Sequence, residues 1–448
     1  RIWGWWFFDW ASQPYNTLLL TFSFGPYFAE LARAHFAAGG MDAEAASAAS
    51  QAYWTATQTV TGVIIAVLAP LLGVIADGRG RKMPWIWGFS IMYVVGAWAL
   101  WWAAPGMPTL FWAAFWFAFG FIGMELATNF TNALMPGLAS HDEMGRVSGT
   151  GFAFGYLGGV IALFLFLLFF ADDAKTGKTL IGLSPAFGLD TAAREGTRSV
   201  GPFTALWYLI FMIPFFLWVR EPAVRGGKKV GAAVGGLARA ISALRRRPSL
   251  LAFLIASMFY RDALNATYAL GGAFASNVMG WTVIQSGVFG IVAAIAATFA
   301  SWAGGKLDAS AGPKPVIVMA VLVLTVTIVV MMNLTPDAFF GHVLPEGSSL
   351  PDMIFYGCGV MIGAAGGIAQ AASRTLMVFH TSEHDAAGDF GFYGLSGKAT
   401  AFLAPALITL ATTATGSARL GIAPLVGLFL IGLVLMIWVK PQGERPAR

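Results

Sequence analysis

Six ionisable side chains lie within long apolar stretches of the sequence, where a charge is costly and usually serves a function. Each would need a water-filled cavity or a partner of opposite charge, because lipid solvates no charge well. A buried cation can bind a carboxylate and a buried carboxylate can bind an ammonium group, so together they suit a zwitterion. A carboxyl group in apolar surroundings also holds a proton more readily and can pass it on. The six residues are Asp9, Glu125, Arg261, Asp262, Arg374 and Lys398.

Depth in the apolar stretches separates these groups. Glu125, Asp262 and Lys398 follow the starts of their stretches by about 10 to 17 residues, which is about 15–25 Å along a helix. That depth corresponds to the middle of a bilayer, where transport sites usually lie. Asp9 and Arg374 are shallower, which favours a gate or a structural ion pair.

Uncharged polar residues accompany the deep charges at helical spacing. Residues three, four or seven apart share one face of a helix, as Glu125 does with Asn129 and Asn132. An alternative is that these groups only satisfy one another within an inert bundle. The predicted proton-coupling residues are Glu125, Asp262 and Asp9. The residues predicted to bind a solute are Lys398, Glu125, Asp262, Arg261, Asn129, Asn265, Tyr15, Tyr268 and Gln370.

The composition indicates which kind of structure carries these residues. Of 448 residues, 57% are hydrophobic and 11% are charged, whereas soluble proteins carry about 25% charged residues. One membrane span takes about 20 apolar residues, and the sequence contains twelve such stretches, which predicts an all-α polytopic membrane protein. The predicted spans are 3–32, 52–76, 84–104, 109–136, 146–171, 201–220, 249–278, 283–306, 314–334, 351–379, 389–413 and 420–439.

The spans fall into two halves that echo each other. A basic connection at 221–248 separates six spans at 1–220 from six at 249–448. Such pseudo-repeats are typical of transporters that move solute between two bundles. The matching pairs are Asp9-x5-Tyr15 with Asp262-x5-Tyr268, Gly73-x3-Asp77 with Gly304-x3-Asp308, and Ser148-Gly149 with Ser396-Gly397.

Charge and motif content exclude several classes of protein. Most cations lie in the loops of one predicted side, which by the positive-inside rule puts both termini in the cytoplasm. The net charge of +5 therefore reflects orientation in a membrane, and we expect no nucleic-acid partner. The sequence lacks common hydrolase signatures, and its single cysteine, Cys358, can form no intramolecular disulfide. We expect no enzyme activity, no cofactor and no metal site.

The stretch between the second and third spans carries a family signal. It reads Gly73-Val-Ile-Ala-Asp77-Gly-Arg79-Gly80-Arg81-Lys82, a glycine-bearing cationic turn that cannot lie in hydrocarbon. It resembles the loop 2–3 signature of the major facilitator superfamily, in which this loop latches one conformational state. Asp77 is expected near the start of the eleventh span, at Gly388 and Asp389, or near Arg146. The resemblance makes Gly73, Asp77, Arg81, Arg146 and Arg374 candidate latch residues.

Other motifs resemble one branch of that superfamily, the autophagy-related vacuolar amino-acid effluxers and their bacterial relatives. The resemblance covers nearly all spans, but Tyr260-Arg261-Asp262-Ala263 departs from the branch's usual tyrosine, asparagine, aspartate, glycine. The added cation leaves the substrate class open. The similar motifs are Phe8-Asp9-Trp10-Ala11, Arg81-Lys82-Met83-Pro84-Trp85, Gly145-Arg146-Val147-Ser148-Gly149, Ser373-Arg374 and Ser396-Gly397-Lys398.

The resemblance implies a secondary transporter that works by alternating access and exports an amino acid or similar zwitterion, with protons as a possible coupling ion. Its partners would be a small solute and the lipid bilayer, and we expect a monomer in a bacterial inner membrane. The alternatives are a sugar, peptide or organic-anion carrier of the same fold and a non-transporting membrane sensor or assembly factor.

Overall fold

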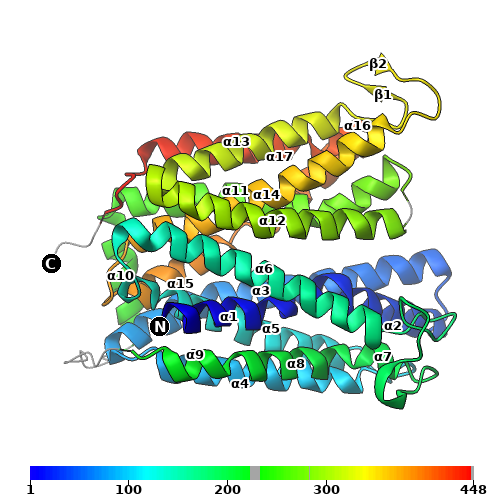
Figure 1. The fold of residues 1–448 in the computed structure, drawn as a ribbon, viewed down its shortest axis with the longest axis horizontal. Helices are drawn as coiled ribbons and strands as arrows, with labels where there is room; N and C mark the ends of the chain where they lie inside the picture. The colour runs from blue at the N-terminus through cyan, green and yellow to red at the C-terminus, as the bar shows by residue number, and fades with distance from the viewer. Residues whose placement is uncertain (222–232, 282, 445–448) are drawn as a thin grey trace. The chain divides into compact units, whose positions relative to one another are not determined.

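Nearly all of the described chain is α-helical. The computed structural model describes residues 1–221, 233–281 and 283–444 (Figure 1). A short antiparallel hairpin pairs β1 (Ala338–Phe339) with β2 (His342–Val343). The helices are α1 (Ile2–Pro14), α2 (Phe24–Ala38), α3 (Ala43–Arg79), α4 (Met83–Ala99), α5 (Phe111–Asn132), α6 (Met144–Phe169), α7 (Glu195–Arg198), α8 (Val200–Phe211), α9 (Ile213–Trp218), α10 (Ala233–Arg245), α11 (Pro248–Asn277), α12 (Val283–Ala311), α13 (Pro313–Met332), α14 (Leu350–Phe379), α15 (Ala386–Ser396), α16 (Leu403–Thr415) and α17 (Ala423–Leu435).

Within the described residues, nine helices are long and apolar enough to cross a membrane. These nine helices correspond to nine of the twelve predicted spans; the first, seventh and eleventh predicted spans have no counterpart among them. The seventh is the 30-residue helix α11, which carries Arg261, Asp262 and Asn265 and is not among these nine. The first and eleventh are each interrupted. The prediction of an all-α membrane protein is confirmed, but the prediction of a continuous helix at 389–413 is wrong.

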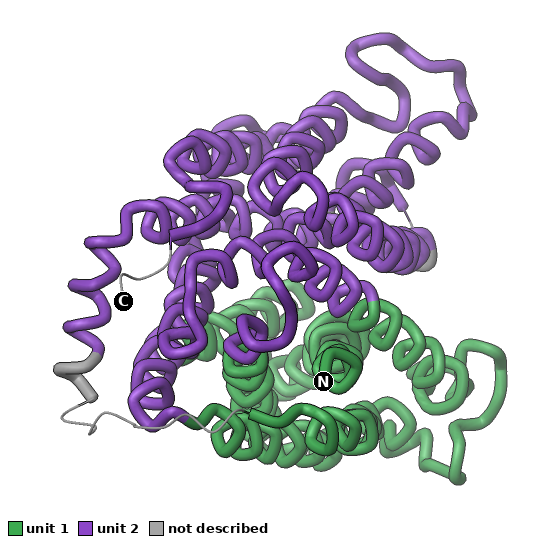
Figure 2. The backbone as a smooth tube through the Cα atoms, turned by 60° about the vertical axis from the view of Figure 1, so that its left-hand side comes forward, with its two compact units in different colours: residues 1–65, 81–131, 154–224 green, residues 66–80, 132–153, 225–448 purple. Residues whose placement is uncertain are grey.

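Contacts within the chain group it into two compact units (Figure 2). One comprises residues 1–65, 81–131 and 154–224, and the other residues 66–80, 132–153 and 225–448. The boundaries fall inside α3 and α6 and at the last residue of α5, so segments of the first half pack with the second half in unit 2. The division into 1–220 and 249–448 stays a prediction. Residues 222–232 of the predicted linker lie outside the described residues, and α10 covers much of the remainder.

Aromatic packing forms the core of unit 1. The rings of Tyr93 and Tyr208 stack at 3.9 Å between centroids, and Tyr15 meets Tyr93 edge-on at 4.8 Å. A Cβ at Gly96 of α4 would lie 2.5 Å from the Gly120 Cα of α5. Such a distance is too short for a side chain, so glycine is what lets these two helices approach.

A row of glycines forms the core of unit 2. Gly359, Gly363 and Gly367 lie four residues apart on α14 and therefore on one face of the helix. A Cβ at Gly363 would overlap the Ala293 carbonyl of α12, and one at Gly359 would press against Phe289. Small residues at this spacing let membrane helices pack backbone against backbone, where van der Waals contact is closest.

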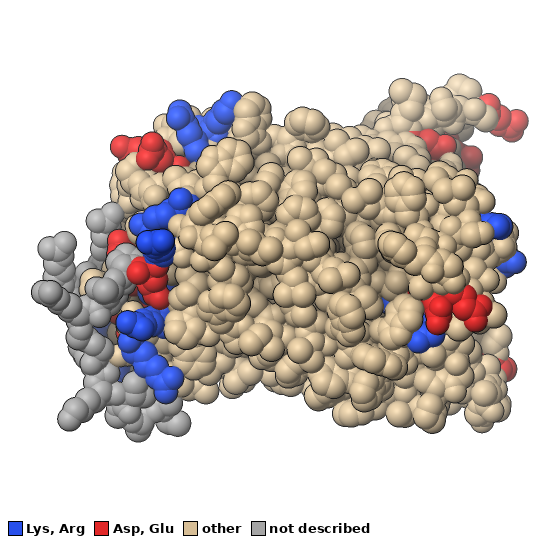
Figure 3. Space-filling model, turned by 60° about the horizontal axis from the view of Figure 1, so that its bottom comes forward, with Lys and Arg blue, Asp and Glu red and all other residues tan. Residues whose placement is uncertain are grey.

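The outer surface suits contact with lipid. On the face shown in Figure 3, charged side chains gather towards the two ends and uncharged residues form the broad band between them. Met319, Leu322 and Val326 of α13 are among the large apolar side chains that this protein leaves exposed. In a membrane, lipid rather than water covers such side chains.

Candidate functional site

The first predicted span is not a regular helix. Residues Tyr15–Phe22 form a π-helix between α1 and α2, a form that is rare and common at functional sites. Pro14, which lacks an N–H, precedes it, so the Trp10 carbonyl loses its usual helical donor. The Trp207 indole donates to that carbonyl at 3.2 Å. Tyr15 begins the π-helix fully buried, and its hydroxyl donates to the Phe117 carbonyl at 2.8 Å.

Glu125 and Asn129 lie on α5 in unit 1. Glu125 is half-buried and Asn129 is buried. The Asn129 amide nitrogen has no hydrogen-bond partner among the described residues, so this donor is able to take a ligand or water. Asn132, expected on the same face, belongs to unit 2 and accepts a hydrogen bond from Arg374 at 3.3 Å. Asp9, on α1, is half-buried and packs against Gly155 of α6.

The eleventh span is interrupted at Lys398, one of the residues predicted to bind solute. Helix α15 ends at Ser396, α16 begins at Leu403, and Lys398 lies half-buried in the turns between them. Gly394 and Gly397 weaken the helix before the interruption. Pro405 gives the Ala401 carbonyl no donor, and its ring crowds that position. Interrupted spans place unpaired backbone groups and helix ends at membrane depth, where transporters bind their solutes and ions.

Arg261 and Asp262 of α11 both contact this interrupted span. Arg261 Nη1 donates to the Tyr393 carbonyl at 2.9 Å, and the guanidinium lies 4.1 Å from the centre of the Tyr393 ring. Asp262 Oδ2 accepts a hydrogen bond from the Ala404 amide at 3.0 Å. Both residues contact the protein's own backbone, and their predicted binding of solute stays a prediction.

The remaining predicted polar residues of unit 2 lie on α11 and α14. Asn265 and Tyr268 are exposed and Gln370 is half-buried. The Tyr268 hydroxyl contacts Gly366, whose carbonyl accepts a hydrogen bond from Gln370 Nε2 at 3.4 Å. Tyr268 and Gln370 therefore both contact Gly366.

Asp77 lies where the sequence placed it. Its carboxylate accepts hydrogen bonds from the backbone amides of Ala387 at 3.1 Å and Gly388 at 2.6 Å. These amides belong to the first turn of α15, where a negative charge is favourable. A Cβ at Gly73 would overlap the Ala387 carbonyl, so glycine is needed for the approach. The expected position of Asp77 is confirmed, whereas its action as a latch stays a prediction.

Arg374 ties α14 to the first turns of α6 within unit 2. Its Nε donates to Ser148 Oγ at 3.0 Å and its Nη2 to the Ser148 carbonyl at 2.8 Å. The guanidinium also lies 4.2 Å from the centre of the Phe152 ring. Arg81 and Arg146, the other predicted latch cations, are exposed.

Two polar clusters were missed by sequence reasoning. One lies in unit 2, where Arg247 Nη1 pairs with the Asp389 carboxylate at 2.9 Å and Thr381 donates to the same carboxylate at 2.7 Å. A cation just before one span and an acid at the start of another were the available signals. Pairing them required knowing which helix ends are neighbours.

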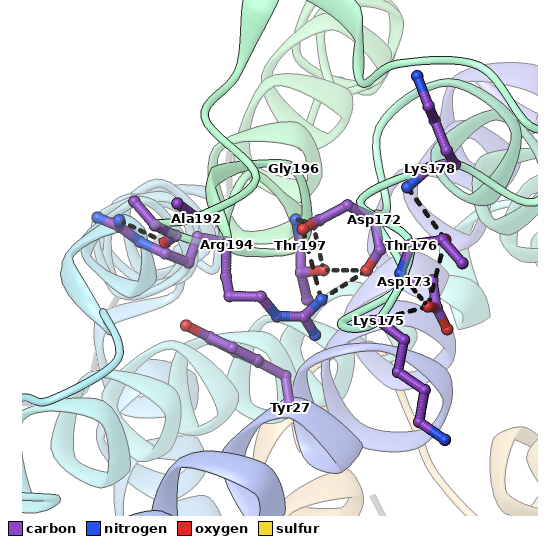
Figure 4. A network of polar contacts seen from close by, with 12 residues as sticks. Tyr27, Asp172, Asp173, Lys175, Thr176, Lys178, Ala192, Arg194, Gly196 and Thr197 are labelled. Carbon is purple, nitrogen blue, oxygen red and sulfur yellow. Dashed lines mark hydrogen bonds and ion pairs between the residues drawn. The ribbon is translucent and has the colours of Figure 1, made fainter.

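The second missed cluster holds the loop at 172–199 in unit 1 (Figure 4). Asp172 Oδ1 accepts hydrogen bonds from the Thr197 amide and hydroxyl, both at 2.7 Å. Arg194 Nη1 donates to the Asp172 carbonyl at 2.7 Å, and its Nη2 pairs with Glu30 of α2 at 3.0 Å. The loop is therefore joined to α2 by an ion pair.

The described residues contain no group of three His, Cys, Asp or Glu side chains that could hold a metal ion. The polar groups instead consist of carboxylates, cations and amides on helices of membrane length. Such groups can bind a charged solute or carry a proton.

The model of one protein family, described as vacuole effluxer Atg22 like, matches residues 1–447. The chain belongs to this family. A relative described as an uncharacterized MFS-type transporter, YxiO of Bacillus subtilis (strain 168), is 25% identical over 98% of this chain and 94% of that protein. Autophagy-related protein 22 of Cryptococcus neoformans var. neoformans serotype D is 24% identical over 67% of this chain. The chain spans 50% of that longer relative.

Solved structures share the fold of this Atg22-like chain. The human organic anion transporter MFSD10 matches with a TM-score of 0.69 at 16% identity, over 97% of this chain and 98% of that chain. The proton:xylose symporter XylE, a major facilitator superfamily protein, matches with a TM-score of 0.72 at 9% identity, over 98% of this chain and 97% of that chain. At these identities the matches show the fold alone. The chain is a membrane transporter of the major facilitator type and not an enzyme.

Proposed function

We propose that this Atg22-like chain exports an amino acid or related zwitterion by alternating access and couples the export to protons. The observation that carries the proposal is the interruption of the eleventh span at Lys398. Interrupted spans bind charged solutes in transporters because helix ends and unpaired backbone groups lie at membrane depth. Lys398 would bind the solute's carboxylate, and the exposed or half-buried Asn265, Tyr268 and Gln370 would line the same face of unit 2.

Glu125 and Asn129 support the proposed coupling to protons and the binding of the solute's ammonium group. A half-buried carboxylate on α5 would bind an ammonium group or take up a proton, and the unpaired Asn129 amide would orient either ligand. Asp9 is a second candidate proton carrier. Tyr15 would act through the π-helix that it begins, since its own hydroxyl is occupied by the Phe117 carbonyl.

The direction and the membrane are proposed from the family and the charge pattern. The family's description as vacuole effluxers favours export. The Bacillus subtilis relative and the distribution of cations favour a bacterial inner membrane with both termini in the cytoplasm. We further propose a monomer in which Gly73, Asp77, Arg81, Arg146 and Arg374 form the conformational latch.

A second candidate is an organic-anion, sugar or peptide carrier. Three cations in the spans, Arg261, Arg374 and Lys398, favour an anionic solute over a neutral one. Two proteins of similar fold are described as an organic anion transporter and a proton:xylose symporter. A non-transporting sensor or assembly factor on the same fold is the third candidate.

Two measurements separate these candidates. The purified protein is heated with a panel of amino acids, dicarboxylates, sugars and dipeptides, because a ligand that binds only the folded state raises the melting temperature. We expect zwitterionic amino acids to give the largest rise. Radiolabelled forms of the best ligands are then offered to proteoliposomes. Binding without any flux would favour a sensor, and a rise confined to anions or sugars would favour the second candidate.

A further inference from the structure

Two consecutive residues of α11 meet the two facing ends of the interrupted eleventh span. Arg261 contacts the last turn of α15, and Asp262 contacts the first turn of α16. A helix carries partial negative charge at its C-terminal end and partial positive charge at its N-terminal end. The cation therefore lies at the negative end and the anion at the positive end, so both charges match the helix ends that they meet.

Asp262 satisfies the one donor of the first turn of α16 that the backbone leaves unpaired. The Leu403 amide donates to the Thr400 carbonyl, the Ala406 amide donates to the Phe402 carbonyl, and Pro405 has no amide hydrogen. The Ala404 amide has Asp262 Oδ2 as its acceptor at 3.0 Å. Asp262 is 5% exposed, and a buried amide without an acceptor would cost the full price of its desolvation.

Arg261 contacts the other half-helix near the end of α15. The Tyr393 carbonyl accepts from the Gly397 amide at 3.2 Å and from Ser396 Oγ at 2.8 Å, and Arg261 Nη1 adds a further donor at 2.9 Å close to the negative end of this helix. The guanidinium carbon lies 4.1 Å from the centre of the Tyr393 ring. A Cβ at Gly397 would lie 2.6 Å from Arg261 Nη2, so the glycine makes room for the cation.

Two further contacts bind the interruption to the same stretch of α11. Thr400 Oγ1 donates to the Met258 carbonyl at 3.3 Å, and the hydroxyl oxygens of Ser257 and Ser396 lie 3.1 Å apart. Four α11 residues within six positions thus hold the residues on both sides of Lys398.

We infer that Arg261 and Asp262 are positioning residues: they clamp the two half-helices of the eleventh span and so fix the backbone on which Lys398 is presented. They act through Lys398 and do not grip the solute themselves. The binding role of Lys398 rests on the proposed function, whereas the clamp rests only on the contacts described here.

The test compares Asp262→Asn with Asp262→Ala in the full-length protein in lipid nanodiscs. Asparagine keeps an oxygen acceptor for the Ala404 amide, whereas alanine removes it. Hydrogen exchange of the segment 399–404 reports the cap directly. Acetylation of Lys398 by acetic anhydride, measured by mass spectrometry, reports how the lysine is presented. Neither readout requires knowing the solute.

We expect Asp262→Ala to raise hydrogen exchange in this segment about fivefold, as the loss of a helix cap usually does, and to change the acetylation rate of Lys398. Lys175 and Lys178 in the 172–199 loop serve as internal references and should react as before. Asp262→Asn should stay within twofold of the parent in both readouts, by order-of-magnitude expectation for a retained cap. Thr267→Val is the matched control, because that hydroxyl only donates to the Ala263 carbonyl of its own helix.

A second pair of variants tests the other end and does not depend on Asp262→Ala folding. Arg261→Met should change hydrogen exchange at 394–399 and Lys398 acetylation, and Gly397→Ala should do the same by displacing the guanidinium. The inference is overturned if Lys398 reacts identically in all these variants. It is also overturned if Asp262→Asn behaves as Asp262→Ala does, since the carboxylate's charge or proton would then matter and not its capping oxygen. Absence of zwitterion binding would contradict the proposed function and leave these outcomes unaffected.

Discussion

At the scale of single residues, Lys398 is the group whose chemistry the proposed function needs most. It is half-buried in the interruption between α15 and α16. Lys398→Met keeps the bulk of the side chain and removes its charge. We expect loss of binding for solutes that carry a carboxylate, with folding preserved, measured by thermal shift and by binding of labelled amino acids. Normal binding by the methionine variant would contradict the assignment.

Glu125 is predicted to carry the coupling proton. Glu125→Gln mimics the protonated carboxyl group permanently, so a proton gradient should no longer drive accumulation in proteoliposomes. Solute exchange at equal pH on both sides requires no net proton movement and should persist in part. Equal loss of both activities, or of neither, would argue against a coupling role. Thr128→Val serves as the control, because its hydroxyl bonds the Met124 carbonyl of its own helix.

His380 predicts how stability depends on pH. Burial lowers the pKa of His380 from 6.5 to about 4. Its Nδ1 lies 2.8 Å from the Leu376 carbonyl, which only accepts, so the neutral ring donates there and accepts from Ser249 at Nε2. The nearby Arg247 and Lys440 oppose protonation and Glu444 favours it, with a smaller effect than burial.

The unfolded chain therefore binds a proton at His380 at higher pH than the folded chain does. This contribution to stability is fully present above about pH 6.5 and is lost as pH falls towards about 4, by an amount on the order of 3 kcal/mol. Melting temperatures measured at pH 7.5, 6 and 5 should fall less steeply in His380→Gln than in the parent. His384→Gln, at an exposed histidine four residues away, should keep the parent's slope. Identical slopes in the parent and His380→Gln would refute the assignment.

At the scale of elements, the contact between Asp77 and α15 predicts a role in the transport cycle. Asp77→Asn removes the charge that favours the positive end of α15 and leaves only one oxygen to accept from two amides. We expect a lower transport rate with nearly normal expression, measured in proteoliposomes. Asp142→Asn, at an exposed acid of the same predicted face, is the matched control. An unchanged rate in Asp77→Asn would show that the contact is no latch.

The interruption of the eleventh span depends both on its local sequence and on its contacts with α11. Gly394, Gly397 and Pro405 make a continuous helix unfavourable at this point, yet glycine and proline occur in many unbroken membrane helices. In the structure, Asp262 accepts from the Ala404 amide on one side of the break and Arg261 donates to the Tyr393 carbonyl on the other. By the inference above, these contacts favour the broken form over a continuous helix.

At the scale of the whole molecule, the proposed export gives a prediction about direction. In inside-out membrane vesicles, the cytoplasmic face is outside, so an exporter should load labelled amino acid into the vesicle lumen when the lumen is acidic. Right-side-out vesicles preloaded with the same solute should release it. The Lys398→Met variant provides the background for both measurements. Net uptake into right-side-out vesicles whose external solution is acidic would contradict export.

Much of the fold follows from properties that each segment has by itself. Apolar length, loop charge and the loop 2–3 motif are local, so the sequence predicted an all-α membrane transporter of the major facilitator type and the spans that form single helices. The motif also predicted that Asp77 lies near the start of the eleventh span or near Arg146, because a negative group is favourable at a positive helix end.

What the sequence could not supply are the partners of groups far apart along the chain. Asp262 caps Ala404, Arg374 holds Ser148, and Arg247 pairs with Asp389, each across more than a hundred residues. Sequence reasoning identified Arg261 and Asp262 as buried charges and assigned them to a solute, since a charge in a span demands some partner. Only the tertiary structure decided that the partners are the ends of a broken helix, because which backbone groups are left unpaired depends on how helices pack. The sequence by itself determined which buried charges need a partner. The packing of α11 against α15 and α16 determined that backbone groups of those two helices are the partners.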